Sequence, residues 1–428
     1  MKKELIISYE DDASKIALIE DGRLFELHEI KQNTDFVVGD IFVGKIKKLA
    51  PNLNAAFVNI GYEKDAFLHY QDLGPQYLTY RKFLQDTISK RQQTSSLKNF
   101  QIQPEIDKHG TVDKVMAAQD EVLLQITKEP ISTKGPRIST QISLTGRFLV
   151  LIPFDNKVSI SKKVKSAEEK ARLKTLIESI KPEGFGVIIR TVAEGKKVAE
   201  LHNDMNQLVD KWNVCFKNIQ KNKTPAKVLS EEDKASAILR DNFNQDFVSI
   251  ICDDEQMVND MKNYLEVIAP ERKNIVQFYD SHIPLLEYYN VEKQLKQSFG
   301  KHVNIPSSKG AYLVIEHTEA LHVVDVNSGN NISSGTANKE HALNVNKMAA
   351  TEIARQLRLR DMGGIIVVDF IDMPNPDHRK ELYEHLREEM KRDKAKHKIL
   401  PPSKFGLIQI TRQRVRPEKQ IDTKEENP

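Results

Sequence analysis

Two apolar segments in the C-terminal third of the chain each contain one aspartate. Residues 311–329 read as two short strands, and the second contains Asp325. Residues 363–373 contain another run of Ile and Val, which is interrupted by Asp369. Near-continuous Val and Ile runs are typical of strands that are covered on both faces. A carboxylate buried there is costly unless a cation neutralises it, so the pattern predicts one cation shared by both aspartates.

The residues between these strands repeat at helical spacing, which predicts a helix inside 336–361 that is ended by Gly363 and Gly364. A strand–helix–strand unit of this kind makes its two strands parallel in one sheet. Asp325 and Asp369 are therefore expected at equivalent places of strands in the same sheet. The apolar positions of the helix are Ala342, Val345, Ala349, Ile353 and Leu357.

The first 35 residues alternate short strands with turns, and the Asp21-Gly22 pair indicates a hairpin. They are too few to form a domain alone. A strand at 247–252 and a helix at 254–267 follow much later. The stretch near 228–300 is therefore predicted to join the first 35 residues in one α/β domain, with other domains inserted between its halves.

From residue 38 onward, short strands with glycine at the bends predict an OB-fold barrel whose last strand is at 121–127. Residues 71–116 interrupt the barrel as a polar insertion that is partly helical at 75–92. A second small sheet with one helix is predicted over 137–190. Helices are expected at 196–221 and 230–245.

Phe57 and Phe67 lie in successive strands of the predicted barrel, near Lys45, Lys47 and Lys48. Aromatic rings beside cations are typical of surfaces that bind single-stranded nucleic acid, because bases stack on the rings. The spacing alone is equally compatible with both rings lying in the core.

A strand predicted at 185–191 ends in Arg190 and Thr191. A guanidinium beside a hydroxyl can hold a phosphate group, since the guanidinium donates two parallel hydrogen bonds and the hydroxyl a third. A purely structural role at the strand end is the alternative. The predicted helix at 377–397 and residues 411–416 are rich in basic side chains, which suits either a phosphate backbone or a solvated surface.

The length of 428 residues indicates roughly two to four domains. The 64 basic and 61 acidic residues leave a net charge of +3, so only the local distribution of charge is informative. Cys215 and Cys252 offer no disulfide framework and no metal-binding spacing, as in a reducing compartment. The apolar start is too short for a signal peptide, and no stretch approaches the ~20 apolar residues of a membrane helix. A cytoplasmic protein without a membrane partner is expected.

Asp325 and Asp369 provide hard oxygen ligands of the kind that Mg²⁺ accepts, with water at the remaining positions. A bound Mg²⁺ lowers the pKa of a water molecule and holds a phosphate oxygen, so that hydroxide attacks phosphorus. Asn327 could orient Asp325 through a hydrogen bond. Asp372 is predicted to continue the strand of Asp369 but to face the opposite side, in a supporting role at most. Two strand-end carboxylates that cap loops are the alternative.

Three segments resemble the signature of the RNase E/RNase G endoribonucleases: 324–328, 352–361 and 364–373. The resemblance extends from the first strand to about residue 416. The stretch at 71–116 is longer than the corresponding stretch of the family. The resemblance implies a multi-domain α/β and β fold. The domains it implies are an RNase H-like α/β domain at 1–36 and 226–301, an OB-fold RNA-binding domain at 37–128 with an insertion at 71–116, a 5′-sensor domain at 129–225, a DNase I-like α/β catalytic subdomain at 302–416, and a polar tail at 417–428.

The resemblance also implies roles for single residues. Asp325 and Asp369 match the family's Mg²⁺ ligands, and Asn327 matches the asparagine that steadies the first of them. The residues that match the family's RNA-binding surface on the barrel are Phe57, Phe67 and Lys134.

Arg190 and Thr191 match the pair that holds a 5′-monophosphate, with Gly146 and Val150 lining that pocket. The family's sensor has a further arginine where this sequence has Lys396. Lysine keeps the charge but lacks the planar fork of arginine, so a softer 5′-phosphate preference is expected.

The family usually continues after the equivalent of Arg416 with a paired-cysteine motif whose zinc ion links two subunits. This sequence reaches Pro428 without such a motif. Either the sequence is truncated before this motif, or its subunits assemble without zinc; both alternatives stay open. A dimer or tetramer is expected from the resemblance, because the family's active site forms near a subunit interface.

The first hypothesis is a magnesium-dependent endoribonuclease that cuts single-stranded RNA, favours 5′-monophosphorylated substrates and acts on rRNA precursors and mRNA. The second is a non-catalytic RNA-binding or ribosome-assembly protein on a nuclease scaffold. A phosphatase of small substrates is the third, and it leaves the barrel unexplained. Magnesium-dependent cleavage of a single-stranded oligonucleotide distinguishes the first two.

Overall fold

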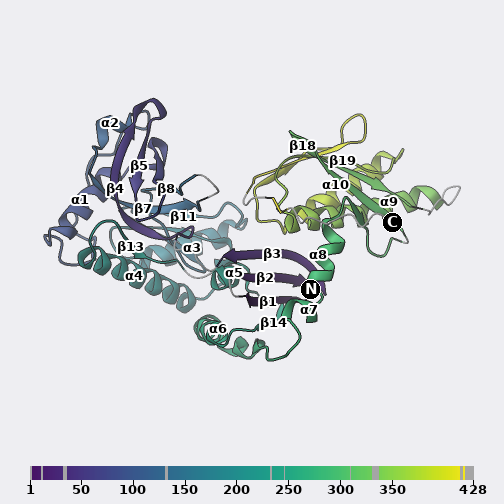
Figure 1. Cartoon of the computed structure of the whole chain (residues 1–428), viewed down its shortest axis with the longest axis horizontal. Coiled ribbons are helices and arrows are strands. Elements are labelled where there is room, and N and C mark those ends of the chain that lie inside the picture. Colours follow the sequence, from purple (N-terminus) through teal and green to yellow (C-terminus); the bar gives the residue numbers. More distant parts are fainter. Residues whose placement is uncertain are drawn as a thin grey trace. The chain divides into compact units, whose positions relative to one another are not determined.

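The computed structural model describes residues 2–10, 13–31, 36–130, 134–231, 234–244, 246–308, 310–329, 337–414 and 418–419. These residues form two compact units. The first unit combines residues 1–32 with 244–428, and the second comprises 33–243 (Figure 1). Arg416 and most of the expected polar tail lie outside the described residues.

The first sheet of the first unit joins the N-terminal strands to later sequence. Its order is β15-β14-β1-β2-β3, with β1 antiparallel to β2 and parallel to β14. This pairing joins the N-terminal strands to β14 and β15, which lie within the segment 228–300 that was predicted to complete their domain. The strands are β1 (Lys3–Glu10), β2 (Ala13–Glu20), β3 (Arg23–Lys31), β14 (Phe247–Cys252) and β15 (Val276–Phe278). The helices are α6 (Glu255–Ile268), the 3-10 helix Pro270–Ile275, α7 (Leu285–Tyr288) and α8 (Val291–Phe299).

The second sheet of this unit contains both aspartates, in the order β16-β17-β18-β19-β21-β20. The helix α9 (Ala337–Leu359) lies between β18 and β19 in the sequence, and these two strands are parallel as predicted. Apolar residues of α9 and of α10 (Pro376–Met390) share one core with the sheet. The strands are β16 (His302–Asn304), β17 (Tyr312–His317), β18 (Leu321–Asn327), β19 (Gly364–Asp369), β20 (His397–Ile399) and β21 (Ile408–Arg412).

Two helix ends differ from the expectation. The helix expected at 377–397 stops at Met390, because Asp393 turns inward and accepts a hydrogen bond from the Arg412 guanidinium at 2.6 Å. The helix α9 ends before the two glycines, and Asp361 takes the left-handed conformation (φ 55°) that terminates it.

The second unit contains a closed five-stranded barrel, consistent with an OB-like fold. Its strands follow the order β4-β5-β6-β8-β7, and β7 pairs back onto β4. They are β4 (Ile41–Ala50), β5 (Ala55–Asn59), β6 (Ala66–His69), β7 (Glu121–Lys128) and β8 (Arg137–Ser139). The predicted insertion contains α1 (Tyr77–Ile88) and α2 (Val112–Val115), and short 3-10 helices occupy Pro51–Leu53 and Tyr70–Asp72.

Two short strands correct the expected division. The strand β8 was expected in the second small sheet, but it closes the barrel because it pairs with both β6 and β7. Residues 226–229 were expected in the domain of the N-terminal strands, but they form the strand β13 (Ala226–Leu229), which pairs with β4. Both satisfy backbone groups that would otherwise be left at sheet edges.

The rest of the second unit is a four-stranded sheet in the order β11-β12-β10-β9. The strands are β9 (Leu144–Thr145), β10 (Leu149–Pro153), β11 (Val158–Ile160) and β12 (Phe185–Ile189). The helices are α3 (Ala167–Ile180), the 3-10 helix Thr191–Ala193, α4 (Val198–Lys221) and α5 (Lys234–Asn242). The rings of Phe83 in the insertion and Trp212 stack at 5.4 Å, so the insertion shares the core of this sheet.

Within the described residues, we find no helix that combines the length and the apolar character needed to cross a bilayer.

Candidate functional site

The two aspartates lie side by side on neighbouring strands. The parallel register of β18 and β19 pairs the Cα atoms of Asp325 and Asp369. Both side chains are exposed, whereas the alternate residues Val324 and Val368 are buried in the core that α9 covers. The two carboxylates therefore project from the face of the sheet that α9 does not cover.

The surroundings of this site raise the pKa of the Asp369 carboxyl group. Partial burial is the largest cause, and the negative charges of Asp325 and Asp372 add to it. Like-charged carboxylates repel one another, and a divalent cation between them would remove the repulsion. Two exposed carboxylates also leave space for water ligands, which Mg²⁺ usually keeps. The donor set fits Mg²⁺.

Asn327 makes the contact that was expected of it. Its Nδ2 donates a hydrogen bond to Oδ2 of Asp325 at 2.9 Å, from the same face of β18. Asp372 lies beyond β19, which ends at Asp369, so strand alternation does not determine the direction of its side chain. Partial burial raises the pKa of Asp369 most, and the negative charge of Asp372 adds to the rise.

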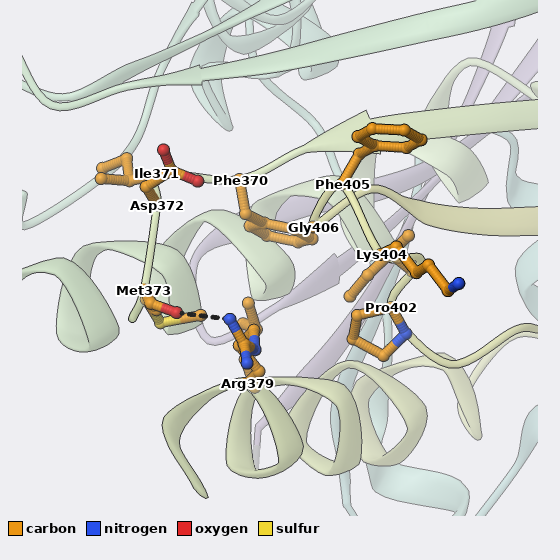
Figure 2. A pocket seen from close by; sticks show the side chains of 11 residues that line it. Phe370, Ile371, Asp372, Met373, Arg379, Pro402, Lys404, Phe405 and Gly406 are labelled. Atoms are coloured by element: carbon orange, nitrogen blue, oxygen red, sulfur yellow. Dashed lines mark hydrogen bonds between the residues drawn. The ribbon is translucent and has the colours of Figure 1, made fainter. Parts of the chain in front are cut away.

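A cavity of about 170 Å³ adjoins this group of acids and includes Asp372 in its lining (Figure 2). Arg379 closes one side, where its guanidinium donates to the Met373 carbonyl at 3.1 Å. Phe405 also lines the cavity, yet 87% of its surface is exposed. Neither Arg379 nor Phe405 was predicted as a site residue, and no motif separated them from other basic and apolar positions.

Phe57 and Phe67 form an aromatic pair on the outside of the barrel. Their Cα atoms are partners across β5 and β6, and their ring centroids lie 5.8 Å apart. The rings are half-buried and lie outside the core, which contains the alternate residues of both strands. The core interpretation of these rings is therefore wrong.

Cations continue this aromatic pair around the barrel. Lys48 on β4 is the backbone partner of Phe57 on β5. Arg137 on β8 is the partner of Phe67 on β6, and it is also the partner of Lys128 on β7. Direct partners on neighbouring strands share one face. The row therefore places two rings beside cations, an arrangement typical of surfaces that bind single-stranded nucleic acid, although the Arg137 guanidinium is paired with Asp72 at 2.8 Å.

Of the other barrel lysines, Lys47 is paired with Asp65 at 3.1 Å, and Lys45 is opposite Asn59. Lys134 is exposed and lies beside the start of β6. A Cβ on the following Gly135 would come within 2.1 Å of the Asp65 carbonyl oxygen, so only glycine allows this close approach.

Four of the residues matched to the 5′-phosphate pocket lie around the end of β12. Nη1 of Arg190 donates to the Gly146 carbonyl at 2.7 Å. The hydroxyls of Thr191 and Ser161 lie 2.9 Å apart, and Val150 is opposite Ile188 across β10 and β12.

Lys396 is exposed and precedes β20 in the other unit. The structure therefore brings Gly146 and Arg190 together within one compact unit, and Lys396 belongs to the other unit. Its part in a sensor stays a prediction.

Asp204 is a residue of this pocket that the sequence pattern did not reveal. Its buried carboxylate accepts backbone N–H groups of Arg147, Phe148 and Leu149, each at 2.9 Å. Burial raises the pKa of Asp204, and these N–H groups together with the charge of Arg190 oppose the rise. A Cβ at position 146 would come within 2.7 Å of the carboxylate, which explains Gly146. The available signal was an acid on the apolar face of α4, three residues after Leu201.

Comparisons with known proteins agree on one family. The model of the Ribonuclease E/G family matches residues 143–415. The chain is 35% identical to ribonuclease E of Nostoc sp. over 97% of its length and 56% of that protein. It is 33% identical to ribonuclease G of Haemophilus influenzae, over 96% of the chain and 80% of the relative. It is 31% identical to ribonuclease G of Escherichia coli K12, over 97% of the chain and 81% of that relative. The chain thus spans little more than half of the ribonuclease E relative.

Proposed function

Because the chain belongs to the ribonuclease E/G family, we propose that it is an endoribonuclease that cuts single-stranded RNA with the help of Mg²⁺. The observation that carries the proposal is the register of β18 and β19, which sets the Asp325 and Asp369 carboxylates side by side. We propose single-stranded segments of rRNA precursors and mRNA as substrates, a cytoplasmic location, and a dimer or tetramer as the assembly.

Asp325 and Asp369 would hold the metal ion, and Asn327 would fix the orientation of Asp325 through its hydrogen bond. When bound, Mg²⁺ supplies Lewis-acid activation of a water molecule and a ligand position for a phosphate oxygen. Phe57 and Phe67 would stack on bases and so hold the strand extended. Cleavage would leave a phosphate on the 5′ end of the downstream product.

The direct test is incubation of the protein with an unstructured, 5′-monophosphorylated RNA oligonucleotide. Internal cleavage with Mg²⁺, and intact RNA with excess chelator, are expected. A matched duplex should resist cleavage, because its bases cannot stack on the barrel rings. Persistent binding of intact RNA after long incubation with Mg²⁺ would favour a non-catalytic RNA-binding protein.

Replacing Phe57 or Phe67 with alanine should weaken RNA binding by about 1–3 kcal/mol, since each ring is worth that much in base stacking. Fluorescence anisotropy with a labelled oligonucleotide measures this change. Phe278→Ala is the matched control, because Phe278 is an exposed phenylalanine on β15, which belongs to the other compact unit and not to the barrel. Equal affinities for all variants would remove the barrel surface from the proposal.

Replacing Arg190 with alanine should lower the ratio of cleavage rates for 5′-monophosphate over 5′-hydroxyl RNA by roughly tenfold or more, because a charge-assisted hydrogen bond contributes about 1.5–3 kcal/mol. The rate on 5′-hydroxyl RNA should change little. Arg91→Ala, at the exposed end of α1, is the control. A uniform loss on both substrates would indicate that Arg190 supports only the fold.

A further inference from the structure

Two histidines and one glutamate meet beside the hairpin that joins β17 and β18, away from the aspartate pair. His317 and His322 are direct partners across the antiparallel strands β17 and β18, and their ring centroids lie 4.5 Å apart. Nε2 of His322 lies 3.5 Å from Oε2 of Glu418. One donor atom from each of the three side chains lies within 4.8 Å of the other two.

The inner histidine is almost fully buried. Only 1% of the His322 surface is exposed, neither ring nitrogen makes a hydrogen bond of good geometry within the described residues, and its polar contacts are the Gly363 backbone and the Glu418 carboxylate. A buried imidazole normally makes well-formed hydrogen bonds, because weak ones do not repay the loss of water. The neighbouring carboxylate and second imidazole are therefore arranged as if a further atom were to join them.

The position of Glu418 is fixed by the residue that follows it. The Lys419 backbone N–H donates to the Arg360 carbonyl at 3.0 Å, and the Lys419 ammonium group is paired with Asp361 at 3.3 Å. The Glu418 carboxylate is thus held against the β17–β18 hairpin by contacts independent of the histidines.

We propose that His317, His322 and Glu418 form a binding site for Zn²⁺, with water as the fourth ligand. Two imidazole nitrogens and one carboxylate oxygen are a common three-residue ligand set for zinc. Imidazole selects against Mg²⁺, which prefers oxygen ligands. The positive charge of Arg414 near His322 opposes a cation here, and the carboxylate of Glu418 offsets it.

This site is separate from the aspartate pair. His322 precedes Asp325 by three residues, an odd number, so the two side chains leave opposite faces of β18. The bound zinc would fasten the segment containing Glu418 to the hairpin that presents Asp325. Its role would be structural, and it involves no cysteine.

Zinc binding is best measured by calorimetry on the full chain with Asp325→Asn and Asp369→Asn, so that the aspartate pair does not contribute. We expect one Zn²⁺ per chain, a rise in melting temperature with Zn²⁺, and no such rise with Mg²⁺. His317→Gln and Glu418→Gln should each weaken binding about tenfold or more, by analogy with the loss of supporting groups at metal sites. Both side chains are at least partly exposed, so neither change should prevent folding.

His302→Gln, on the neighbouring strand β16, is the matched control and should leave zinc affinity unchanged. Absence of zinc binding at micromolar concentrations would overturn the proposal. Equal zinc affinity in the His317, Glu418 and His302 variants would overturn it as well.

A second observation concerns the cavity beside Asp372. The Phe405 ring stands apart from the other side chains that line the cavity (Figure 2), on a turn where the Gly406 N–H donates to the Ser403 carbonyl at 3.0 Å. Gly406 has a φ of 85°, which favours glycine. A tight turn therefore presents an 87% exposed aromatic ring beside the acids.

We infer that this cavity receives one base of the RNA strand, an inference that rests on the proposed function. At about 170 Å³ the cavity is smaller than the roughly 300–1,000 Å³ of drug-sized sites, and it suits a small flat group. Phe405 offers a face for stacking, and Lys404 a cation for the adjoining phosphate. A base held here would belong to a nucleotide close to the phosphate at Asp369.

The test uses an oligonucleotide that contains the fluorescent base 2-aminopurine, bound to the Asp369→Asn variant so that RNA stays intact. Stacking on Phe405 should quench the fluorescence at one position of the strand, and Phe405→Ala should restore it. In the active chain, Phe405→Ala should lower kcat/KM about tenfold. Phe278→Ala is the control for both.

Unchanged quenching and unchanged kcat/KM in Phe405→Ala would overturn the base site while leaving the nuclease proposal intact. Failure of the unmodified chain to cut RNA would instead reject the nuclease proposal. The quenching experiment would then still decide whether Phe405 stacks on a base.

Discussion

Replacing Asp369 with asparagine is expected to lower the rate of RNA cleavage by roughly 10³-fold or more, since several kcal/mol of charge stabilisation come from a catalytic metal ion and each ~1.4 kcal/mol is tenfold in rate. Asparagine keeps the size of the side chain and removes its charge. RNA affinity should persist, because Phe57 and Phe67 lie in the other compact unit. Single-turnover cleavage and anisotropy on the same samples separate the two effects.

The matched control is Glu316→Gln, which removes an exposed carboxylate from β17 in the same sheet. Its cleavage rate should stay within about twofold of the unmodified chain, because exposed ion pairs contribute little.

Raising the Mg²⁺ concentration should rescue part of the activity of an Asn327→Ala variant, in which both carboxylates are kept. Full cleavage by Asp369→Asn, or cleavage in excess chelator, would refute the metal mechanism.

The aspartate pair was predictable because its cause is local. A run of apolar residues, a helix-spaced segment and a second apolar run determine a parallel crossover, which places equivalent positions side by side. Asn327 followed from strand alternation, since residues two apart share a face. The same rule does not apply to Asp372, because the strand ends at Asp369 and alternation ends with it.

The residues of β8 were assigned to the wrong sheet, and those of β13 were not predicted as a strand, for a different reason. A strand of three or four residues has too few positions for its alternation to identify a partner. Its sheet is decided by which backbone edges remain open, and that depends on contacts distant in the sequence. Asp204 was missed likewise, because its partners at 147–149 precede it by more than fifty residues.

The segment 352–361 shows a further limit of motif reading. It resembles a nuclease signature, yet its charged side chains make buried contacts with the N-terminal sheet of the same unit. Arg355 donates to the Leu24 carbonyl at 2.7 Å, and Glu352 accepts from Arg23 at 2.5 Å. These residues join α9 to β3, and the catalytic strands are held by the same helix. Their role in the family signature is therefore architectural in this chain.

Replacing Arg358 with methionine is expected to destabilise the first unit by about 3–5 kcal/mol, the cost of breaking a buried ion pair by removing one partner. The Arg358 guanidinium lies 3.2 Å from Glu20 and 2.8 Å from Glu26, and its side chain is only 7% exposed. Methionine preserves much of the apolar stem of the arginine side chain, so the loss of stability reports on the missing guanidinium charge. Urea denaturation followed by circular dichroism measures the change, and fluorescence of Trp212 reports on the other unit.

The effect should depend on pH with a definite sign. Burial alone would raise the pKa of Glu26, but the hydrogen bond to His28 and the charge of Arg358 outweigh it and hold the pKa well below its usual range. The stabilisation is thus complete above the unfolded pKa of about 4.3 and is lost as the pH falls below it. The difference between Arg358→Met and the unmodified chain should therefore be largest near neutral pH and shrink on acidification.

Arg392→Met, which removes a half-exposed arginine after α10, should cost less than about 1 kcal/mol at any pH. Adding Glu20→Gln and Glu26→Gln to Arg358→Met should recover much of the lost stability, because no unpaired charge then stays buried. If Arg358→Met were no more destabilising than Arg392→Met, the buried network would not hold α9 to the N-terminal sheet. Asp325, which α9 supports from the opposite face of its sheet, would then depend on the apolar core alone for its position.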